Sequence, residues 1–284
     1  MEWKERRLTV SGLELTAKQW GDDDAKPVLA LHGWLDNAAS FDGLAPLLGD
    51  AVQLVALDLP GHGSSQGRGA DQAYHFVDWV GVVLESADAL GWETFSILGH
   101  SMGAAIAALT APVAPQRIER MVFLDGMGPW SNPPEKVVEQ LRKALSQERV
   151  LRNSRGRLYD STDEMVDAMA KSREDVGRER LRPLVERVAR RTEDGRWRFG
   201  HHRMLQAASR IRLTEEQVCT FLSSIACPVL LVRPEGGWPV DEEVMKGRLD
   251  EVEDLQIHRV QGGHHVHLEA PGRLSEAVRK FLTG

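Results

Sequence analysis

Short apolar segments alternate with amphipathic ones along most of this chain. The apolar segments are rich in Val, Leu and Ile and nearly continuous, which is typical of strands buried on both faces of a parallel sheet. They cover residues 28–33, 52–61, 95–101, 121–126, 228–233 and 255–260. Helical patterns follow at about 72–90, 102–112 and 271–282, and a hairpin turning at Ser11–Gly12 precedes them. This alternation predicts an α/β fold with a mostly parallel sheet flanked by helices.

The alternation stops between residues 128 and 226. This part opens with the break GPWSNPP and then shows amphipathic helical patterns without a strong strand, at about 133–149, 162–175, 178–191 and 214–224. We interpret residues 128–226 as a helical cap inserted after the sixth strand. The core is then expected to consist of residues 1–127 and 227–284.

Charge is unevenly distributed along the 284 residues. The formal net charge is -7, yet residues 135–215 hold 20 Lys and Arg against 14 Asp and Glu. One interpretation is a set of solvated helices whose charged side chains form ion pairs. The other is a positive lid over a site that receives polar or anionic substrates. The acidic chain has no basic-aromatic motif, which argues against a nucleic-acid partner.

Several observations bear on localisation. No apolar stretch reaches the roughly 18 residues that a membrane-spanning helix needs. No apolar run follows the charged start MEWKERRLTV, so we expect no signal peptide. Cys219 and Cys227 show no metal-ligand spacing and favour a reducing compartment. The sequence therefore predicts a cytoplasmic protein that needs no metal or organic cofactor.

The strongest chemical motif is Gly99-His100-Ser101-Met102-Gly103 in FSILGHSMGAAIAAL. It directly follows an apolar strand and directly precedes an Ala-rich helix, which is the context of a nucleophile elbow. Glycines are needed on both sides because a Cβ there would collide with the neighbouring strand or helix. The turn lifts the serine hydroxyl above the sheet edge, so Ser101 is the predicted nucleophile.

Two backbone N–H groups are candidates for an oxyanion hole. In an elbow architecture one donor follows the nucleophile, here Met102, and the other comes from the loop after an earlier strand. That loop begins at His32-Gly33 in LALHGWLDNAASF, which makes Trp34 the second donor. We expect His32 to brace this loop rather than to move protons, and Asp58 in LDLPGHGSS to hold a turn.

A general base is predicted in VQGGHHVHLEAP. The final strand ends at Gly262-Gly263, and a loop in this place can carry a histidine to the serine hydroxyl. We select His264, directly after the glycine pair. His265 and His267 in the same loop are expected to pack or to shape it.

The order Ser101…His264, with the elbow and the oxyanion loop, resembles the α/β-hydrolase superfamily over nearly the whole chain. LHGWLDNAASFDGLAPLL, SILGHSMG and GGHHVHLEAP are similar to its serine hydrolase-like proteins, whose natural substrates are poorly defined. The resemblance implies an eight-stranded, mostly parallel sheet with a helical cap. Related dehalogenases and epoxide hydrolases carry an aspartate in the elbow, whereas a serine there implies acyl transfer.

A serine–histidine pair of this kind needs an acid that orients the histidine, and the chain offers several candidates. In this superfamily the loop after the seventh strand usually carries it, where this chain has Gly237, with Glu235 and Asp241 off the usual place. Asp125 ends the buried strand in RMVFLDGMGP, at the same sheet edge as Ser101. Some superfamily members, including certain dehalogenases, place their acid there. We therefore predict Asp125, against the alternatives that Asp241, Glu235 or no residue fills the role.

These residues together predict an esterase that cleaves small to medium carboxylic esters through an acyl-enzyme. Trp130 and Trp238 are expected to line its substrate pocket, although both could equally belong to the core. Other chemistries on the same triad remain open, namely perhydrolase, thioesterase, lactonase and C–C bond hydrolase. A binding protein that keeps the fold without catalysis is a further alternative, and a broken triad would be its mark.

Overall fold

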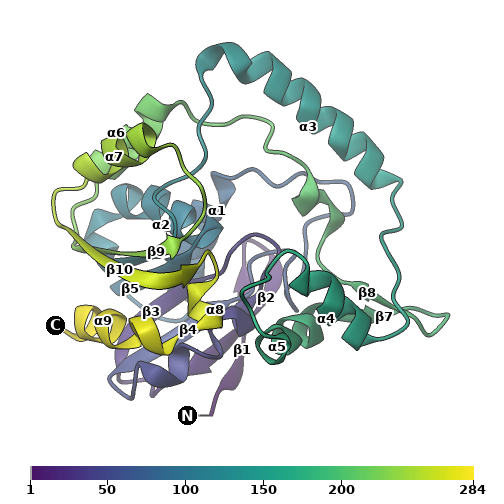
Figure 1. Cartoon of the computed structure of the whole chain (residues 1–284), viewed down its shortest axis with the longest axis horizontal. Helices are drawn as coiled ribbons and strands as arrows, with labels where there is room; N and C mark the ends of the chain where they lie inside the picture. The colour runs from purple at the N-terminus through teal and green to yellow at the C-terminus, as the bar shows by residue number, and fades with distance from the viewer. Residues whose placement is uncertain (1) are drawn as a thin grey trace.

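The computed structural model describes residues 2–284, and a single large sheet organises them (Figure 1). The strand order in this eight-stranded sheet is β1-β2-β4-β3-β5-β6-β9-β10. The pairs β1–β2 and β2–β4 are antiparallel, and the other neighbours are parallel. The strands are β1 (Lys4–Val10), β2 (Leu13–Trp20), β3 (Lys26–Leu31), β4 (Val52–Leu57), β5 (Phe95–His100), β6 (Ile118–Leu124), β9 (Val229–Gly236) and β10 (Leu255–Gly263). The predicted mostly parallel α/β architecture is confirmed.

Helices cover both faces of the sheet. They are α1 (Asp78–Ala89), α2 (Met102–Val113), α3 (Val137–Arg152), α4 (Thr162–Ala170), α5 (Arg178–Val188), α6 (Glu215–Ser223), α7 (Glu242–Asp250), α8 (Val266–Glu269) and α9 (Gly272–Thr283). None of the helices within residues 2–284 is both long and apolar enough to cross a membrane.

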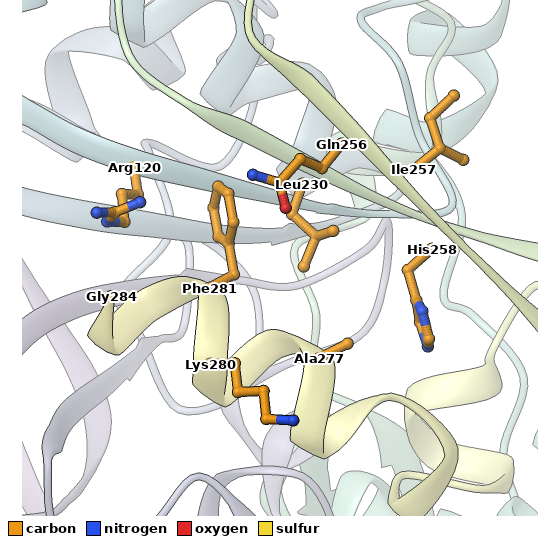
Figure 2. A pocket seen from close by; sticks show the side chains of 9 residues that line it. All are labelled: Arg120, Leu230, Gln256, Ile257, His258, Ala277, Lys280, Phe281 and Gly284. Atoms are coloured by element: carbon orange, nitrogen blue, oxygen red, sulfur yellow. The ribbon is translucent and has the colours of Figure 1, made fainter.

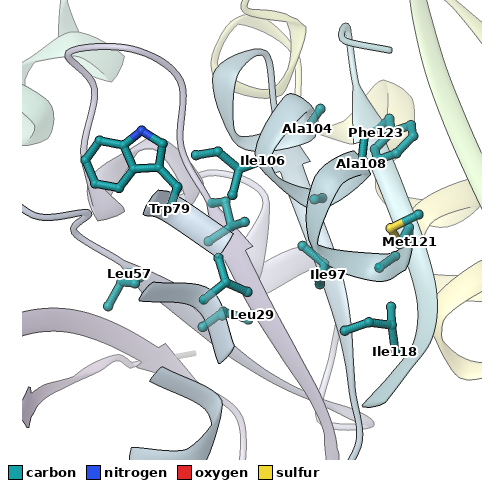
Figure 3. Close-up of a cluster of buried hydrophobic side chains, with 14 of the residues drawn as sticks. Leu29, Leu57, Trp79, Ile97, Ala104, Ile106, Ala108, Ile118, Met121 and Phe123 are labelled. Carbon is teal, nitrogen blue, oxygen red and sulfur yellow. The ribbon is translucent and has the colours of Figure 1, made fainter. Parts of the chain in front are cut away.

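Side chains at alternate positions on the central strands pack into two separate apolar cores. In β3, Leu29 and Leu31 pack on the face covered by α1 and α2, while Val28 and Ala30 pack on the opposite face with α9. All four are fully buried. Figure 3 shows the first of these cores, in which side chains of β3, β5 and β6 meet the small alanines of α2. Burial on both faces explains why the strands read as continuous apolar runs.

The segment between β6 and β9, residues 128–226, contains the four expected helices α3 to α6. Two of them, α4 and α5, are shorter than predicted. The helix α5 ends at Val188 because the chain then becomes extended and forms the small hairpin β7 (Ala189–Arg191) and β8 (Trp197–Phe199). Gly195, with a φ of 84°, closes the turn of this hairpin. We call residues 128–226 the inserted segment. Its division from the core as a cap domain stays a prediction.

The inserted segment is attached in two different ways. Val218 and Leu222 of α6 belong to the same apolar core as α2, so α6 packs on the sheet side of the molecule. The helices α4 and α5 form a small apolar core of their own, which Ala39 and Leu268 join from the sheet side. In Figure 1 α3 runs along the outer side of the molecule.

Three boundaries in the structure differ from the predicted ones. The strand predicted at 52–61 ends at Leu57, since Pro60 and Gly61 turn the chain and Gly61 has a φ of 77°. The helix predicted at 72–90 begins only at Asp78. Conversely, β9 continues beyond the predicted end at residue 233 as far as Gly236, alongside β10.

Candidate active site

Ser101 lies in a strained turn between β5 and α2. Its φ is 51° and its ψ is -109°, a conformation that side-chain-bearing residues rarely adopt. The backbone N–H of Ser101 donates to the carbonyl of Leu124 in β6 at 3.0 Å, which holds the turn on the sheet. A Cβ on Gly99 would lie 2.5 Å from the amide nitrogen of Ala104, and one on Gly103 would overlap the carbonyl of Leu31. Close packing therefore requires both glycines of the motif.

A continuous hydrogen-bonded chain joins Ser101, His264 and Asp125. His264 Nδ1 lies 2.5 Å from Asp125 Oδ2, and His264 Nε2 lies 3.0 Å from Ser101 Oγ. A carboxylate only accepts hydrogen bonds, so Nδ1 carries the proton. This leaves the lone pair of Nε2 to accept the hydrogen bond of the serine hydroxyl. The structure thus brings together the three residues that the sequence singled out.

The carboxylate of Asp125 takes up the space beside Gly237. Asp125 follows β6 with a φ of 47°, and its Oδ2 also accepts a 2.7 Å hydrogen bond from the N–H of Trp238. A Cβ on Gly237 would collide with this carboxylate. The position after β9 therefore lies against the acid but has no room for a side chain while Asp125 is present.

The two alternative candidates for the catalytic acid have other positions in the fold. Asp241 is the N-cap of α7, where its Oδ1 accepts from the N–H groups of Glu243 and Val244 at 2.9 and 3.1 Å. Glu235 is exposed near the end of β9.

The two predicted oxyanion donors follow neighbouring strands. Trp34 comes after β3 and Met102 after β5, and these strands pair in parallel with Leu31 opposite Gly99. Met102 is the first residue of α2, where a backbone N–H has no partner within the helix. Leu35, with a φ of 59°, bends the loop directly after Trp34. Both N–H groups thus belong to the sheet edge that carries Ser101, and their role stays a prediction.

Comparison with known proteins decides the family. The family model of the α/β-hydrolase fold matches residues 26–271. The chain belongs to the α/β hydrolases. A serine hydrolase-like protein of Dictyostelium discoideum is 31% identical over 96% of this chain and 79% of its own. A serine hydrolase-like protein of Danio rerio is 29% identical, and the match covers 98% of this chain and 88% of that protein.

Solved structures agree on the fold. A hypothetical protein from Pseudomonas aeruginosa superposes with a TM-score of 0.90 at 37% identity, covering 99% of this chain and 98% of that one. A thioesterase domain from the curacin biosynthetic pathway has a TM-score of 0.85 at 21% identity, over 98% and 99% of the two chains. The second likeness concerns the fold alone.

The loop after β3 carries the predicted oxyanion donor Trp34, and we call it the oxyanion loop. Three of its side chains fasten it to the inserted segment. The indole N–H of Trp34 donates to the carbonyl of Leu205 at 2.8 Å, and the amide of Asn37 donates to the carbonyl of Leu184 at 2.9 Å. Between them, Asp36 forms a buried ion pair with Arg173 at 2.5 Å. Sequence reasoning missed these contacts, and the only signal for them was a polar stretch directly after a buried strand.

The buried ion pair is held in its charged form. Burial alone would raise the pKa of Asp36, but the adjacent Arg173 guanidinium is the strongest opposing influence, and the pKa lies below its ordinary value. Asp36 therefore remains an anion at neutral pH. Because each buried charge depends on the other, the oxyanion loop and the inserted segment are coupled at this point.

Three further imidazoles crowd around His264. The ring of His100 lies 4.8 Å from that of His264 and 4.0 Å from that of His267, measured between centroids. Burial lowers the pKa of His265 to about 4, and it lowers the pKa values of His100 and His267 well below the ordinary value. These rings are neutral at pH 7. His100 Nε2 donates to the carbonyl of His264 at 2.9 Å and so supports the loop that carries the base.

Three of these imidazoles are close enough to one another to share a metal ion. Ligand atoms of His100, His264 and His265 lie within 4.8 Å of one another. Both ring nitrogens of His264, however, are engaged by Asp125 and Ser101. A metal ion would have to displace one of these partners, so the arrangement favours the hydrogen-bonded chain.

Tryptophans form a wall beside the triad. Trp238 stands edge-on to the His264 ring with centroids 5.1 Å apart, and Trp130 packs against Trp238 at 5.9 Å. The exposed fractions of Trp34, Trp130 and Trp238 are 52%, 60% and 47%. Of the two predicted pocket residues, Trp238 therefore lies next to His264 and Trp130 lies beside Trp238, and both keep much of their surface open to a ligand.

A separate hollow lies at the other end of the sheet (Figure 2). It is lined by side chains such as Leu230, Gln256 and Phe281, from the beginnings of β9 and β10 and from α9. Ser101 follows the carboxyl end of β5, so this hollow is remote from the hydrogen-bonded chain. In open α/β sheets ligands bind at the carboxyl edge, and we assign the site there.

Proposed function

We propose that this protein is a serine hydrolase that cleaves carboxylic esters through an acyl-enzyme. The observation that carries the proposal is the hydrogen-bonded chain from Ser101 through His264 to Asp125. Such a chain supports nucleophilic catalysis because the serine hydroxyl is a weak nucleophile until a base removes its proton. An intact chain also favours an enzyme over a binding protein that merely keeps the fold.

The first half of the reaction forms the acyl-enzyme. His264 Nε2 takes the proton of Ser101 while Oγ attacks the ester carbonyl. The N–H groups of Trp34 and Met102 stabilise the negative charge on the former carbonyl oxygen, and Asp125 stabilises the imidazolium through Nδ1–H. The tetrahedral intermediate then collapses, and His264 returns its proton to the departing alcohol.

The second half releases the acid. A water molecule gives a proton to His264 and attacks the acyl-enzyme carbonyl, so a second tetrahedral intermediate forms in the same oxyanion hole. Its collapse breaks the bond to Ser101, and the proton on His264 passes back to the Ser101 oxygen. Residues 128–226 act in this proposal as a cap. The tryptophan wall supplies an apolar surface for small to medium substrates.

Hydrolysis of a graded ester series tests this function. Purified protein is assayed with p-nitrophenyl esters of increasing acyl length, together with the variants Ser101→Ala and Ser275→Ala. We expect Ser101→Ala to lose about 10⁴-fold or more in kcat with unchanged circular dichroism, since the triad acts as a unit. Ser275→Ala, a substitution on α9, is the matched control and keeps wild-type rates. Equal activity in all three proteins would overturn the proposal.

A further inference from the structure

Arg212 is a half-buried arginine without an acidic partner. Its guanidinium carbon lies 5.2 Å from the ring centroid of Trp130. None of the Asp and Glu side chains in residues 2–284 comes within ion-pair distance of it, whereas nearby Arg210 bonds to both carboxylate oxygens of Glu148. Burial lowers the pKa of Arg212, whereas the pKa values of Arg187 and Arg210, which face carboxylates, are raised. The protein thus pays the desolvation of this cation without an internal counter-ion.

A row of aromatic contacts leads from Arg212 to the triad. The guanidinium lies over Trp130, Trp130 packs against Trp238, and Trp238 packs against the ring of His264, in steps of 5.2, 5.9 and 5.1 Å. Trp130 and Trp238 remain 60% and 47% exposed. A ligand lying along these two rings with its carbonyl at Ser101 therefore reaches toward a cation.

The guanidinium of Arg212 determines which chemical group of a ligand fits beside it. A planar fork of N–H donors matches the two oxygens of a carboxylate, and stacking on Trp130 fixes the plane of the fork. The surrounding residues 135–215 carry more Lys and Arg than Asp and Glu, 20 against 14, which favours the approach of an anion.

We propose that Arg212 is a carboxylate-binding residue of the substrate site, and that the preferred substrates are esters that also carry a free carboxylate. The apolar part of such a substrate lies along Trp130 and Trp238, with the ester at Ser101 and the carboxylate at Arg212. This inference rests on the proposed function, because it assigns the ester carbonyl to Ser101.

The ratio of the kcat/KM values of two substrates measures the contribution of Arg212. Mono-p-nitrophenyl esters of dicarboxylic acids of increasing length are compared with the uncharged esters of equal length, as kcat/KM. We expect the charged ester to be preferred at one chain length and the preference to fall with rising salt, since screening weakens charge attraction. In Arg212→Gln the preference should fall about 10- to 100-fold, the worth of a charge-assisted hydrogen bond. Arg212→Lys should keep part of it.

The control removes an equal charge elsewhere in the same basic segment. Arg149→Gln changes an exposed arginine of α3 and should leave the preference within about twofold. Esters of uncharged acids with carboxylated alcohols form a second series that tells which side of the ester carries the charge. Hydrolysis of charged and uncharged esters at equal rates in both series, or an equal loss in Arg149→Gln and Arg212→Gln, would overturn the inference.

A binding measurement keeps this inference separate from the proposed function. In Ser101→Ala, calorimetry compares binding of the mono-p-nitrophenyl dicarboxylates with binding of the uncharged esters. Tighter binding of the charged ester, lost in Ser101→Ala/Arg212→Gln, supports the carboxylate site even if the wild-type protein hydrolyses neither ester. Hydrolysis of uncharged esters by the wild-type protein, with no preference in rate or binding, would remove the carboxylate site and leave the proposed function standing.

Discussion

The sheet edge and the inserted segment meet through Trp130 and Trp238 and through the loop after β3, but they are held in different ways. The edge consists of strand ends whose side chains are buried on both faces, and it fixes Ser101, Asp125 and His264. The inserted segment contributes α3, which leaves several apolar side chains partly exposed, with exposed fractions of 44%, 63%, 39% and 48% for Val137, Val138, Leu141 and Leu145. In the proposed function the chemistry rests on the tightly packed region, and substrate contact largely on the looser one. Substitutions can therefore separate them.

The largest effect is expected from the acid. Asp125→Asn should lower kcat by about 10⁴-fold, because an amide cannot hold the imidazole in the right tautomer or stabilise its charge. Asp241→Asn is the matched control. It keeps an N-cap acceptor on α7 but removes the negative charge at the helix N-terminus, at a cost of up to about 1 kcal/mol in the free energy of unfolding, and keeps kcat. Steady-state kinetics and urea unfolding check both. Full activity in Asp125→Asn with a collapse in Asp241→Asn would show that the acid lies in the β9 loop.

Relocation of the carboxylate sharpens this test. A side chain on Gly237 collides with Asp125, so Gly237→Asp alone should be impaired. In Asp125→Gly/Gly237→Asp the space is free and the new carboxylate approaches His264 Nδ1. We expect kcat to recover about tenfold relative to Asp125→Gly. No recovery would mean that residue 237 does not reach the base.

The two regions should also differ in how far a leucine-to-alanine substitution lowers the free energy of unfolding. Leu98 in β5 is fully buried, and Leu98→Ala should cost about 2–5 kcal/mol of the free energy of unfolding through the cavity that it leaves. Leu145 on α3 is 48% exposed, and Leu145→Ala should cost less than about 1 kcal/mol. Urea unfolding measures both. Similar losses would contradict the difference in packing between the two regions.

A smaller effect is expected on the pH dependence of stability. Burial lowers the pKa values of His100, His265 and His267, that of His265 to about 4. Between pH 6.5 and 4 these residues bind protons in the unfolded chain but not in the native protein, so stability falls as the pH falls. His265→Gln should make this loss shallower in thermal melts, whereas His75→Gln, at an exposed position, should not. Identical pH profiles in wild type and His265→Gln would contradict the neutral cluster.

The sequence allowed the strands and the elbow to be predicted because their signals are local. A strand such as β5 is buried at every position, and the glycines around Ser101 answer a steric need within five residues. The choice between Asp125 and Asp241 was harder, since it depends on which side chain faces a loop more than a hundred residues away. The ion pair of Asp36 with Arg173 and the hairpin β7–β8 carry no periodic signal and arise from tertiary neighbours.

Covalent labelling tests the central claim most directly, that Ser101 is a nucleophile activated through His264 and Asp125. The protein is treated with a fluorophosphonate and the adduct is located by peptide mass mapping. The account predicts one adduct, on Ser101, no adduct in Ser101→Ala, and much slower labelling in Asp125→Asn. An adduct on a different serine, or labelling of Ser101→Ala at the wild-type rate, would contradict it.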